Sequence, residues 1–425
     1  MRYDVPPLLM DEDKLVDAVG EISVTELPDF TPRNATQLKS ATPMIDRLWR
    51  IALHDAEANI IRTDTDAYFG AGTEFGPLVY TRDISYAGIL GLNRLYPDLM
   101  LRSLEFTRRL RLDLGLRVPA IYKPDDIEAD WEVLDIEPQD FLKQFRTNCY
   151  MRRTDDVVWL WCIGDLADQA GSEIDWEWVY RTGAMCFERL YDPFFDPVDG
   201  LFRGQATFVD IHFPHAKATG YPQEWSILDC VRAKATSTNC LYVKGMRVLA
   251  AAAENSGRSN EAVSWRRRAD DLVDAIRREL RRADGTYTYL KDKTGVLAPR
   301  SHVLGSALVV LLGIESGDDA VRAVGSYPLT DAGAPLFDPF YPENNFYHNN
   351  SSWPFADTFL IKALEQADGQ DRTALNAALL ARTCRWDGTF HEVVDFRDKE
   401  VRGSGSQLWS AAAFIDTCRR AGLLS

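Results

Sequence analysis

Residues 346–355 read Phe346-Tyr347-His348-Asn349-Asn350-Ser351-Ser352-Trp353-Pro354-Phe355, a stretch that gathers aromatic rings, amides and an imidazole. An apolar run from Ala356 to Leu364 follows it and predicts a helix. Asn350 or Ser351 would cap that helix, and Pro354 is tolerated in its first turn. Flat rings beside short amides offer an apolar face together with donors and acceptors for hydroxyl groups. We interpret the stretch as the rim of a carbohydrate pocket; the alternative is a loop whose rings pack on the core.

Helical spacing of apolar residues continues on both sides of this stretch. Residues 38–61, for example, carry Ile45, Leu48, Ala52 and Ala56 at such spacing. Further helices are predicted at 83–95, 97–112, 155–170, 173–191, 237–255, 259–282, 302–313, 317–326, 351–367, 372–384 and 406–421. Loops with short strand pieces are predicted at 64–80, 115–150, 192–235, 328–350 and 385–404, with a turn or hairpin at 284–291.

The order of these elements predicts a single helical toroid. Helices follow one another in pairs, and loops carrying Trp, Asp, Glu and Asn recur between them. Long strands and a Rossmann fingerprint are missing from the sequence, so a parallel sheet is not expected. Inner helices would bury their faces around one axis, and the loops would converge on one mouth of the barrel as a deep pocket. Residues 1–37 are expected to form an irregular or strand-containing lead-in, packed on a domain of residues 38–425.

The amino-acid composition and the net charge argue against some classes of binding partner. The 425 residues are 46% hydrophobic and 26% charged, as in soluble globular proteins, and the net charge of -16 argues against nucleic acid or an anionic membrane as a partner. No apolar run reaches the roughly 18 residues of a membrane span, and the N-terminus lacks an apolar signal core, so a cytoplasmic location is expected. The 7 Cys, without a C-x-x-C pair, are expected to be buried thiols of a reducing compartment. The sequence does not indicate an oligomeric state.

Known cofactor motifs are missing from the sequence. The 6 His form no H-E-x-x-H motif and no Cys/His cluster, so no metal site is expected. The sequence also lacks a P-loop, a dinucleotide fingerprint and a G-x-S-x-G motif at a strand–helix junction, and no organic cofactor is expected. The loops instead hold carboxylates beside aromatic residues. A pair of carboxylates, one acid and one base or nucleophile, is the equipment of glycoside hydrolysis.

The first candidate carboxylate lies in Tyr80-Thr81-Arg82-Asp83. Arg82 would hold Asp83 in its ionised form, and an ionised carboxylate accepts strong hydrogen bonds from two neighbouring sugar hydroxyls. The alternative is that Asp83 only caps a helix.

The second candidate is Asp210, which ends the alternating, strand-like piece 200–210. Apolar neighbours raise the pKa of a carboxyl group and allow it to act as an acid. Glu224, in the segment Tyr221-Pro222-Gln223-Glu224-Trp225, is a rival for that role. The alternative for Asp210 is a simple turn residue.

The third candidate is Glu392. Asp387-Gly388 predicts a turn, and residues 389–394 predict a short strand from which Glu392 and Phe390 project on one face. Glu392 would activate a water molecule as general base; the alternative is a solvated residue at a strand edge. Some Trp residues are candidate stacking platforms, although each is more often part of a core: Trp225, Trp353, Trp386 and Trp409.

Several of these pieces recur together in a known family. In chain order they are Tyr80-Thr81-Arg82-Asp83, Gly204 to Asp210, Thr236-Ser237-Thr238-Asn239, Tyr347 to Phe355 and Gly403 to Trp409. This arrangement resembles the six-hairpin, (α/α)6-barrel glycosidases, and in particular the bacterial mannosylglycerate- and glucosylglycerate-hydrolase-like group of glycoside hydrolase family 63. The resemblance implies an all-α, (α/α)6 toroid with short β pieces in the loops at the pocket mouth.

The resemblance also implies inversion, with an Asp acid and a Glu base near the C-terminus. These roles fall on Asp210 and Glu392. The chain has Phe208-Val209-Asp210 where the family usually has Gly-Trp-Asp around the acid. Substrate contacts are expected from Tyr80, Arg82, Asp83, Gln205, Glu224, Trp225, Tyr347, His348, Asn350, Trp353 and Trp409.

We therefore expect an inverting, exo-acting hydrolase of a small α-glycoside, such as a disaccharide, a short oligosaccharide or a glycosyl-glycerate. One alternative is a sugar epimerase or isomerase on the same barrel, which would transfer protons through His; His212, His215, His348 and His391 lie in candidate loops. A phosphorylase, a polysaccharide lyase and a non-catalytic sugar-binding protein are further alternatives. The sequence specifies neither the sugar nor the linkage nor the aglycone.

Overall fold

The structure, a computed structural model, describes residues 9–17, 19–39, 41–76, 79–117, 154–170, 174–209, 220–225, 227–343 and 347–424. Most of this part of the chain is helical. The α-helices are α1 (Pro43–Ala58), α2 (Thr81–Ala87), α3 (Asn93–Leu95), α4 (Pro97–Arg117), α7 (Asp155–Ala170), α8 (Trp176–Cys186), α9 (Ile227–Arg232), α10 (Thr236–Asn255), α11 (Ser259–Leu280), α12 (Val303–Leu311), α13 (Gly317–Val324), α14 (Pro354–Asp368), α15 (Thr373–Ala381) and α16 (Leu408–Arg420).

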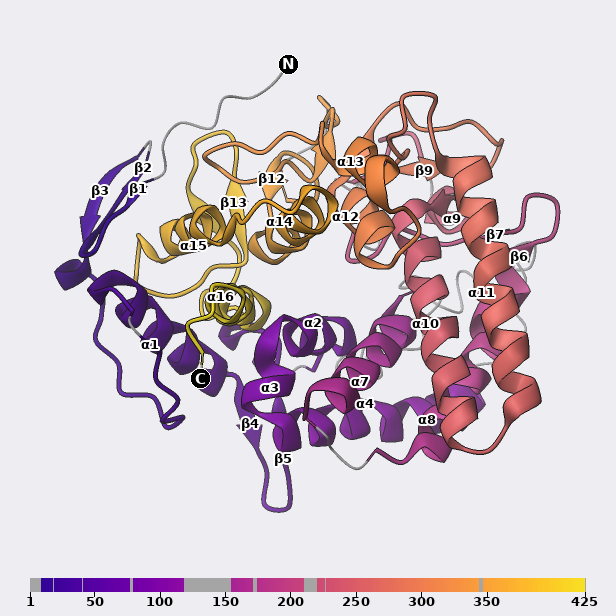
Figure 1. Ribbon diagram of the computed structural model, residues 1–425, viewed down its shortest axis with the longest axis horizontal. Coiled ribbons are helices and arrows are strands. Elements are labelled where there is room, and N and C mark those ends of the chain that lie inside the picture. The colour runs from indigo at the N-terminus through magenta and orange to yellow at the C-terminus, as the bar shows by residue number, and fades with distance from the viewer. Residues whose placement is uncertain are drawn as a thin grey trace.

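The helices form two concentric layers (Figure 1). In the inner layer each helix contacts the next, and the last contacts the first, so that the layer closes on itself; in order they are α2, α7, α10, α12, α14 and α16. Helices α1, α4, α8, α11, α13 and α15 lie outside, each against at least one inner helix. Along the described chain, these outer and inner helices alternate. This arrangement is an all-α toroid, as predicted from the pairing of helices in the sequence.

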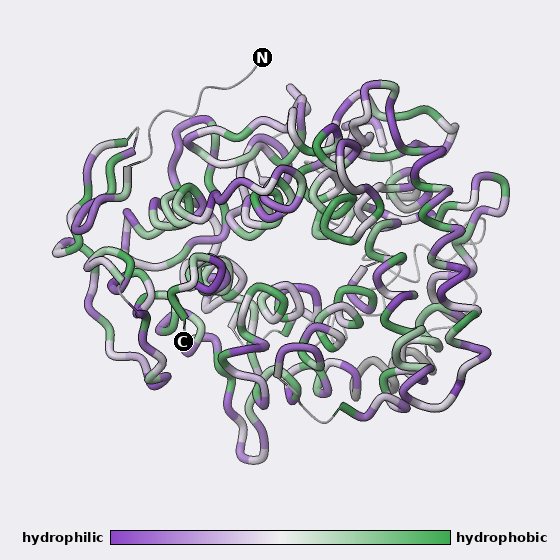
Figure 2. The backbone as a smooth tube through the Cα atoms, viewed as in Figure 1, coloured by the Kyte–Doolittle hydropathy of each residue, from purple (hydrophilic) through white to green (hydrophobic). Residues whose placement is uncertain are grey.

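Hydropathy explains which helices lie inside. The outer helix α11 buries one stripe, with Trp265, Ala269, Leu272 and Ile276 at intervals of three to four residues, while charged side chains occupy its other face. Figure 2 shows hydrophilic and hydrophobic segments alternating along this helix. The inner helix α12 is apolar on all sides, and each residue from Val303 to Val310 is buried. A helix that is apolar all round requires neighbours on every side, and the inner layer provides them.

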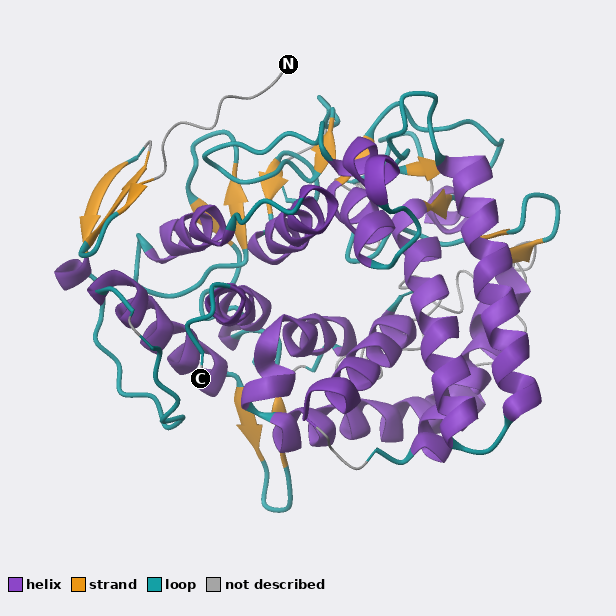
Figure 3. Cartoon of the chain, viewed as in Figure 1, coloured by secondary structure: helices purple, strands orange, loops and turns teal. Residues whose placement is uncertain are grey.

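Short strands occupy the segments that lead from an outer helix into the next inner helix (Figure 3). They are β4 (Ile60–Arg62), β5 (Ala67–Phe69), β6 (Phe195–Asp196), β7 (Leu201–Phe202), β8 (Lys234–Ala235), β9 (Leu290–Lys291), β10 (Ser301–His302), β11 (Phe337–Asp338), β12 (Ser351–Ser352), β13 (Val393–Asp395) and β14 (Val401–Arg402). All pair in antiparallel fashion, in the sheets β4-β5, β6-β7, β8-β9, β10-β11 and β12-β13-β14. Strands from distant loops therefore lie together at one level of the toroid.

The N-terminal lead-in is the antiparallel meander β1 (Leu9–Met10), β2 (Lys14–Asp17) and β3 (Gly20–Ser23). Strand β1 contacts the outer helix α15, and Arg385 Nη2 lies 2.8 Å from Asp17 Oδ1. The 6 cysteines in the described part of the chain are buried free thiols, as expected, and Cys149 lies outside that part. Among the described helices, none combines the length and the apolarity needed to cross a membrane.

Several predicted boundaries are wrong. The first helix begins at Pro43 rather than Leu38, because Thr42 caps it and Pro43 occupies its first turn. The helix predicted at 83–95 is interrupted at Leu90 and Gly91, where Gly91 has a φ of 128°. The turn or hairpin predicted at 284–291 is confirmed as a turn, since an antiparallel bridge joins Arg281 to Tyr287 across it, while β9 at its end pairs with the distant β8.

Two further predictions fail around α9 and α14. Helix α9 was not predicted at all. Ser351 does not cap α14, because it pairs with Asp395 in β12, and Trp353 stands at the N-cap with Pro354 in the first turn. Most of the loop predicted at 115–150 lies outside the described residues.

Candidate functional site

The start of the inner helix α10 holds the segment that leads toward Asp210. Asn239 Oδ1 accepts the Phe202 N–H at 2.8 Å, and its Nδ2 donates to the Phe202 carbonyl at 3.1 Å. Ser237 Oγ accepts the Thr207 N–H at 3.2 Å, and the Thr238 hydroxyl donates to a backbone carbonyl of the same segment. Through these hydrogen bonds, the Thr236-Ser237-Thr238-Asn239 motif holds the backbone of residues 202–207 in place.

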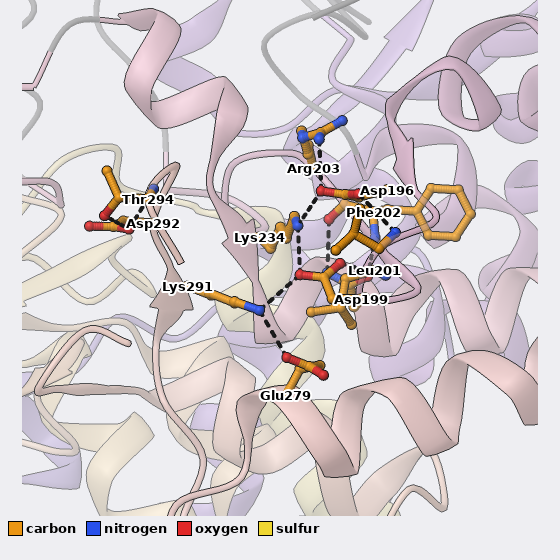
Figure 4. A network of polar contacts seen from close by, with 12 residues as sticks. Asp196, Asp199, Leu201, Phe202, Arg203, Lys234, Glu279, Lys291, Asp292 and Thr294 are labelled. Atoms are coloured by element: carbon orange, nitrogen blue, oxygen red, sulfur yellow. Dashed lines mark hydrogen bonds and ion pairs between the residues drawn. The ribbon is translucent and has the colours of Figure 1, made fainter. Parts of the chain in front are cut away.

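An ion cluster anchors the other end of this segment (Figure 4). Lys234 Nζ lies 2.6 Å from Asp196 Oδ2 and 2.6 Å from Asp199 Oδ2, and Lys291 Nζ lies 2.9 Å from Asp199 Oδ2 and 2.8 Å from Glu279 Oε2. Burial, the largest single influence, would raise the pKa of Asp196 and Asp199, but the hydrogen bonds and charges of Lys234 and the neighbouring donors together outweigh it and hold both pKa values below the usual range. The cluster lines a cleft of about 700 Å³.

Phe208 lies at the centre of an aromatic cluster. Its φ of 53° is uncommon for a residue with a side chain, and such backbone strain concentrates at functional sites. The ring centroid of Phe208 lies 5.7 Å from that of His302 and 5.2 Å from that of Trp353. Trp353 in turn stacks on His348 at 5.1 Å and meets Trp409 edge-on at 5.8 Å. We call Phe208, His302, His348, Trp353, Phe355 and Trp409 the aromatic cluster.

Glu392 lies beside this cluster and is 4% exposed, so it is not a solvated edge residue. The Tyr347 hydroxyl donates to Glu392 Oε1 at 3.0 Å, and the Ser404 N–H donates to Oε2 at 3.3 Å. Gly403 has a φ of 73°, and a Cβ there would lie 2.0 Å from Oε2. The carboxylate is thus positioned by two donors and by a close approach that only glycine permits. The predicted strand begins one residue later than Glu392, at Val393.

Arg82 and Asp83 are both buried in the first turn of α2. Asp83 is not the N-cap, since Tyr80 occupies that position. Arg82 forms an ion pair with Asp155 of the inner helix α7, at 3.9 Å between Nη1 and Oδ1. The sequence analysis did not single out Asp155, because a carboxylate in the first turn of a helix resembles an ordinary cap.

A chain of hydroxyl groups connects α2 and α7 to the Phe208 segment. The Tyr86 hydroxyl lies 2.8 Å from Thr207 Oγ1, and Thr154 Oγ1 donates to the same oxygen at 3.0 Å. All three residues are buried. None was predicted as a site residue, because they are distant in sequence; Thr207 lies in the Gly204 to Asp210 piece but was not assigned a role.

Two buried polar side chains stand out because they lack partners. Gln205 and His302 are each 1% exposed, and within the described part of the chain neither amide atom of Gln205 and neither ring nitrogen of His302 has a hydrogen-bond partner. Burial, with a smaller contribution from nearby His348, lowers the pKa of His302 to about 3. Unsatisfied buried polar groups are rare in native proteins and call for an explanation such as a ligand. Gln205 was predicted to bind substrate; His302 was not.

Glu224 and Trp225, which were also predicted to contact substrate, differ in their exposure. Glu224 is exposed and Trp225 is half-buried, stacked on Tyr221 at 6.2 Å. The Tyr221 hydroxyl contacts the Ala206 N–H and the Val209 carbonyl, which places this segment beside residues 206–209. The strand-like piece predicted at 200–210 is a strand only at Leu201–Phe202, and its remaining described residues form a turn and irregular structure.

Other predicted positions are not drawn into the aromatic cluster. Asn350 is half-buried, and its backbone carbonyl accepts from Phe396. Trp386 is 38% exposed and lies at the surface. Asp210, His212 and His215 lie outside the described residues. Over the described residues, His, Cys, Asp and Glu form no group of three or more that could hold a metal ion.

Comparison with known proteins gives a family match. Residues 211–410 match the model of the Mannosylglycerate hydrolase MGH1-like glycoside hydrolase domain. No curated protein matches the sequence.

Solved structures with the same fold include several glycosidases. A glycosidase variant in complex with glucose is 17% identical, with 90% of this chain and 98% of that chain covered and a TM-score of 0.60. The family 63 mannosylglycerate hydrolase of Thermus thermophilus, in complex with Tris and D-glycerate, is 15% identical, with 87% and 99% covered and a TM-score of 0.56. The family 78 rhamnosidase of Bacillus sp. GL1 is 15% identical, with 91% of this chain but 36% of that chain covered and a TM-score of 0.53. At these identities the likeness shows the fold.

Proposed function

We propose that this chain, a glycoside hydrolase similar to the mannosylglycerate hydrolase-like enzymes, is an inverting, exo-acting enzyme that cleaves a small α-glycoside. The substrate would be a disaccharide, a short oligosaccharide or a glycosyl-glycerate. The observation that carries the proposal is the buried carboxylate of Glu392 beside the aromatic cluster, held by the Tyr347 hydroxyl and the Ser404 N–H. A carboxylate fixed in this way beside rings suited to a pyranose is the arrangement that glycoside hydrolysis requires.

Glu392 is proposed as the general base. Its carboxylate would take a proton from a water molecule as the water attacks the anomeric carbon from the face opposite the leaving group. Tyr347 and Ser404 would keep one oxygen of the carboxylate oriented toward that water. No metal or organic cofactor takes part in the proposed step.

Asp210 is proposed as the general acid that protonates the departing glycosidic oxygen. The backbone contacts of Ser237 and Tyr221 support this assignment, because they fix the segment that ends at Val209. An inverting pair of carboxyl groups is separated by about 6.5–9.5 Å, which leaves room for the attacking water. Glu224 is a weaker candidate for the acid, since its side chain is exposed to solvent rather than held in an apolar surrounding.

The proposal assigns the sugar contacts to the residues predicted from the sequence. Arg82, Asp83 and Gln205 would bind hydroxyl groups from the side of α2 and the Phe208 segment; Trp353, Trp409 and His348 would line the ring-binding face. The closed inner layer of helices supports an (α/α)6, six-hairpin barrel over residues 38–425, with residues 1–37 as a lead-in packed on it. Because the loops at one level bring these side chains together, a single exo-acting pocket is proposed.

The decisive experiment compares three variants on a panel of α-linked disaccharides, 4-nitrophenyl α-glycosides, mannosylglycerate and glucosylglycerate. Asp210→Asn and Glu392→Gln are each expected to lower kcat by about 10²–10⁴-fold with the fold intact, while Glu400→Gln, a change at an exposed position, leaves kcat unchanged. NMR of the first product should show the β-anomer released from an α-glycoside. Release of the α-anomer would contradict inversion, and full activity in either acid variant would remove that residue from the mechanism.

A further inference from the structure

His302 stands at the junction of two inner helices. It is the N-cap residue of α12 and ends β10, which pairs with β11. A Cβ added at Gly305 would lie 3.7 Å from His302 Cβ and 3.7 Å from the Ser237 nitrogen at the start of α10. His302 therefore lies between the start of α12 and the start of α10, which holds the Phe208 segment.

The imidazole ring of His302 packs against other aromatic rings. Its centroid is 5.7 Å from that of Phe208, 5.3 Å from that of Phe337 and 5.5 Å from that of Tyr289. The ring is 1% exposed, and over the described residues both of its nitrogens lack a hydrogen-bond partner. Leaving such groups unpaired lowers stability, so a partner that arrives with a ligand would recover that free energy.

We propose that His302 is a further sugar-binding residue of this pocket, which hydrogen-bonds a hydroxyl group of the glycosyl residue through an imidazole nitrogen. The inference rests on the proposed function and deepens it. It places a polar contact on the α12 side of the aromatic cluster, opposite the contacts expected from α2.

The chemistry of the ring restricts the group it would bind. The pKa of about 3 keeps His302 uncharged in the physiological range, so the ring offers one donor and one acceptor. A hydroxyl group, which both donates and accepts, matches that ring. A carboxylate, which only accepts, would match a charged imidazolium instead. The ligand at this position is therefore a neutral pyranose hydroxyl rather than the carboxylate of a sugar acid or a glycerate.

The same low pKa argues against a proton-transfer role. A general base works best with a pKa near the operating pH, and His302 is far below it. His302 would therefore contact the substrate without exchanging a proton with it, which separates this proposal from a His-dependent isomerase.

The test uses calorimetric titration of the full chain with glucose, mannose and the monodeoxy forms of glucose. His302→Phe keeps a ring of similar shape, and His54→Phe makes the same change on the outer helix α1, where His54 stacks on Phe30. We expect His302→Phe to bind the preferred hexose about 10-fold more weakly than the wild type, with His54→Phe unchanged. The wild type should also bind one deoxy sugar about 10-fold more weakly than its parent, and His302→Phe should not distinguish the two. His302→Gln, which retains a donor and an acceptor, should restore part of the affinity.

Two outcomes would overturn the proposal and are distinguishable from one another. Equal affinity of the wild type and His302→Phe for every sugar, alongside normal glycoside hydrolysis, would remove His302 from the pocket and leave the proposed function intact. A wild-type protein that neither binds a hexose nor hydrolyses any glycoside of the panel would remove both.

Discussion

Lys234 and His302 are both almost inaccessible to solvent, at 7% and 1% exposure, yet their polar atoms are in opposite situations. Lys234 lies between two carboxylates at 2.6 Å, whereas the ring nitrogens of His302 have no partner within the described residues. A buried charge is tolerated when it is compensated, and a buried polar group without a partner lowers stability. The ion cluster around Lys234 therefore stabilises the fold, whereas the buried imidazole of His302 lowers its stability.

Removing the central cation gives the strongest test of this contrast. Lys234→Met removes the buried cation that Asp196 and Asp199 share and leaves them only Arg203 and Lys291 as counter-charges, and we expect the free energy of unfolding to fall by about 3 kcal/mol. Denaturant unfolding followed by circular dichroism measures this change. Lys14→Met, which removes a largely exposed ion pair with Glu21, serves as the control and should cost less than about 1 kcal/mol. A loss for Lys234→Met as small as that of the control would show that the cluster does not support the scaffold.

The ion cluster around Lys234 also shows which contacts cannot be predicted from the sequence. Glu392 and Trp353 could be predicted, because each lies in a short motif of rings and polar groups. Lys234 and Asp196 could not, since their pairing joins two loops that share no local pattern. His302 was counted among the histidines but not assigned, because only the three-dimensional arrangement reveals that its nitrogens have no partner among the residues that the structure describes.

The fold could be predicted more completely than the site, for a related reason. Amphipathic and fully apolar helices such as α11 and α12 carry their periodicity within one stretch of sequence, so their existence was predicted correctly. The strands are only a few residues long, and β8 finds its partner β9 beyond two helices. Such pairing has no local signal. The turn predicted at 284–291 is present, but the pairing of β9 with β8 could not be predicted from it.

The geometry around Glu392 allows a test in which stability and activity separate. Gly403 and Gly369 have nearly equal φ values, 73° and 72°, so replacement of either by Ala strains the backbone similarly. At Gly403 the new Cβ would lie 2.0 Å from Glu392 Oε2, whereas at Gly369 nothing lies within 4 Å. We expect Gly369→Ala to lose about 1 kcal/mol of stability and Gly403→Ala to lose more, because a clash with Glu392 adds to the same backbone strain. Only Gly403→Ala should lose activity, by about 10²-fold in kcat, because a displacement of about 1 Å disorders the catalytic geometry.

Comparing the two variants separates the effect of displacing the Glu392 carboxylate from the effect of backbone strain. Kinetics on the best substrate of the glycoside panel measure kcat, and thermal unfolding measures stability. Equal kcat values for Gly403→Ala and Gly369→Ala would indicate that the position of Glu392 does not limit turnover, and the carboxylate would lose its proposed role as base.

The smallest expected effect is a difference in pH dependence between wild type and His302→Phe. An unfolded His has a pKa near 6.5, and His302 in the folded protein has a pKa of about 3. Between these values the unfolded chain binds the proton and the folded chain does not, so the His302 contribution to the free energy of unfolding falls as the pH falls from 6.5 toward 3. Phe does not titrate. The stability of His302→Phe relative to the wild type should therefore increase by roughly 2 kcal/mol between pH 7 and pH 5. His302→Gln, which also does not titrate, should follow the same pH profile; parallel curves for all three proteins would mean that the imidazole is hydrated or paired, and the contrast with Lys234 would disappear.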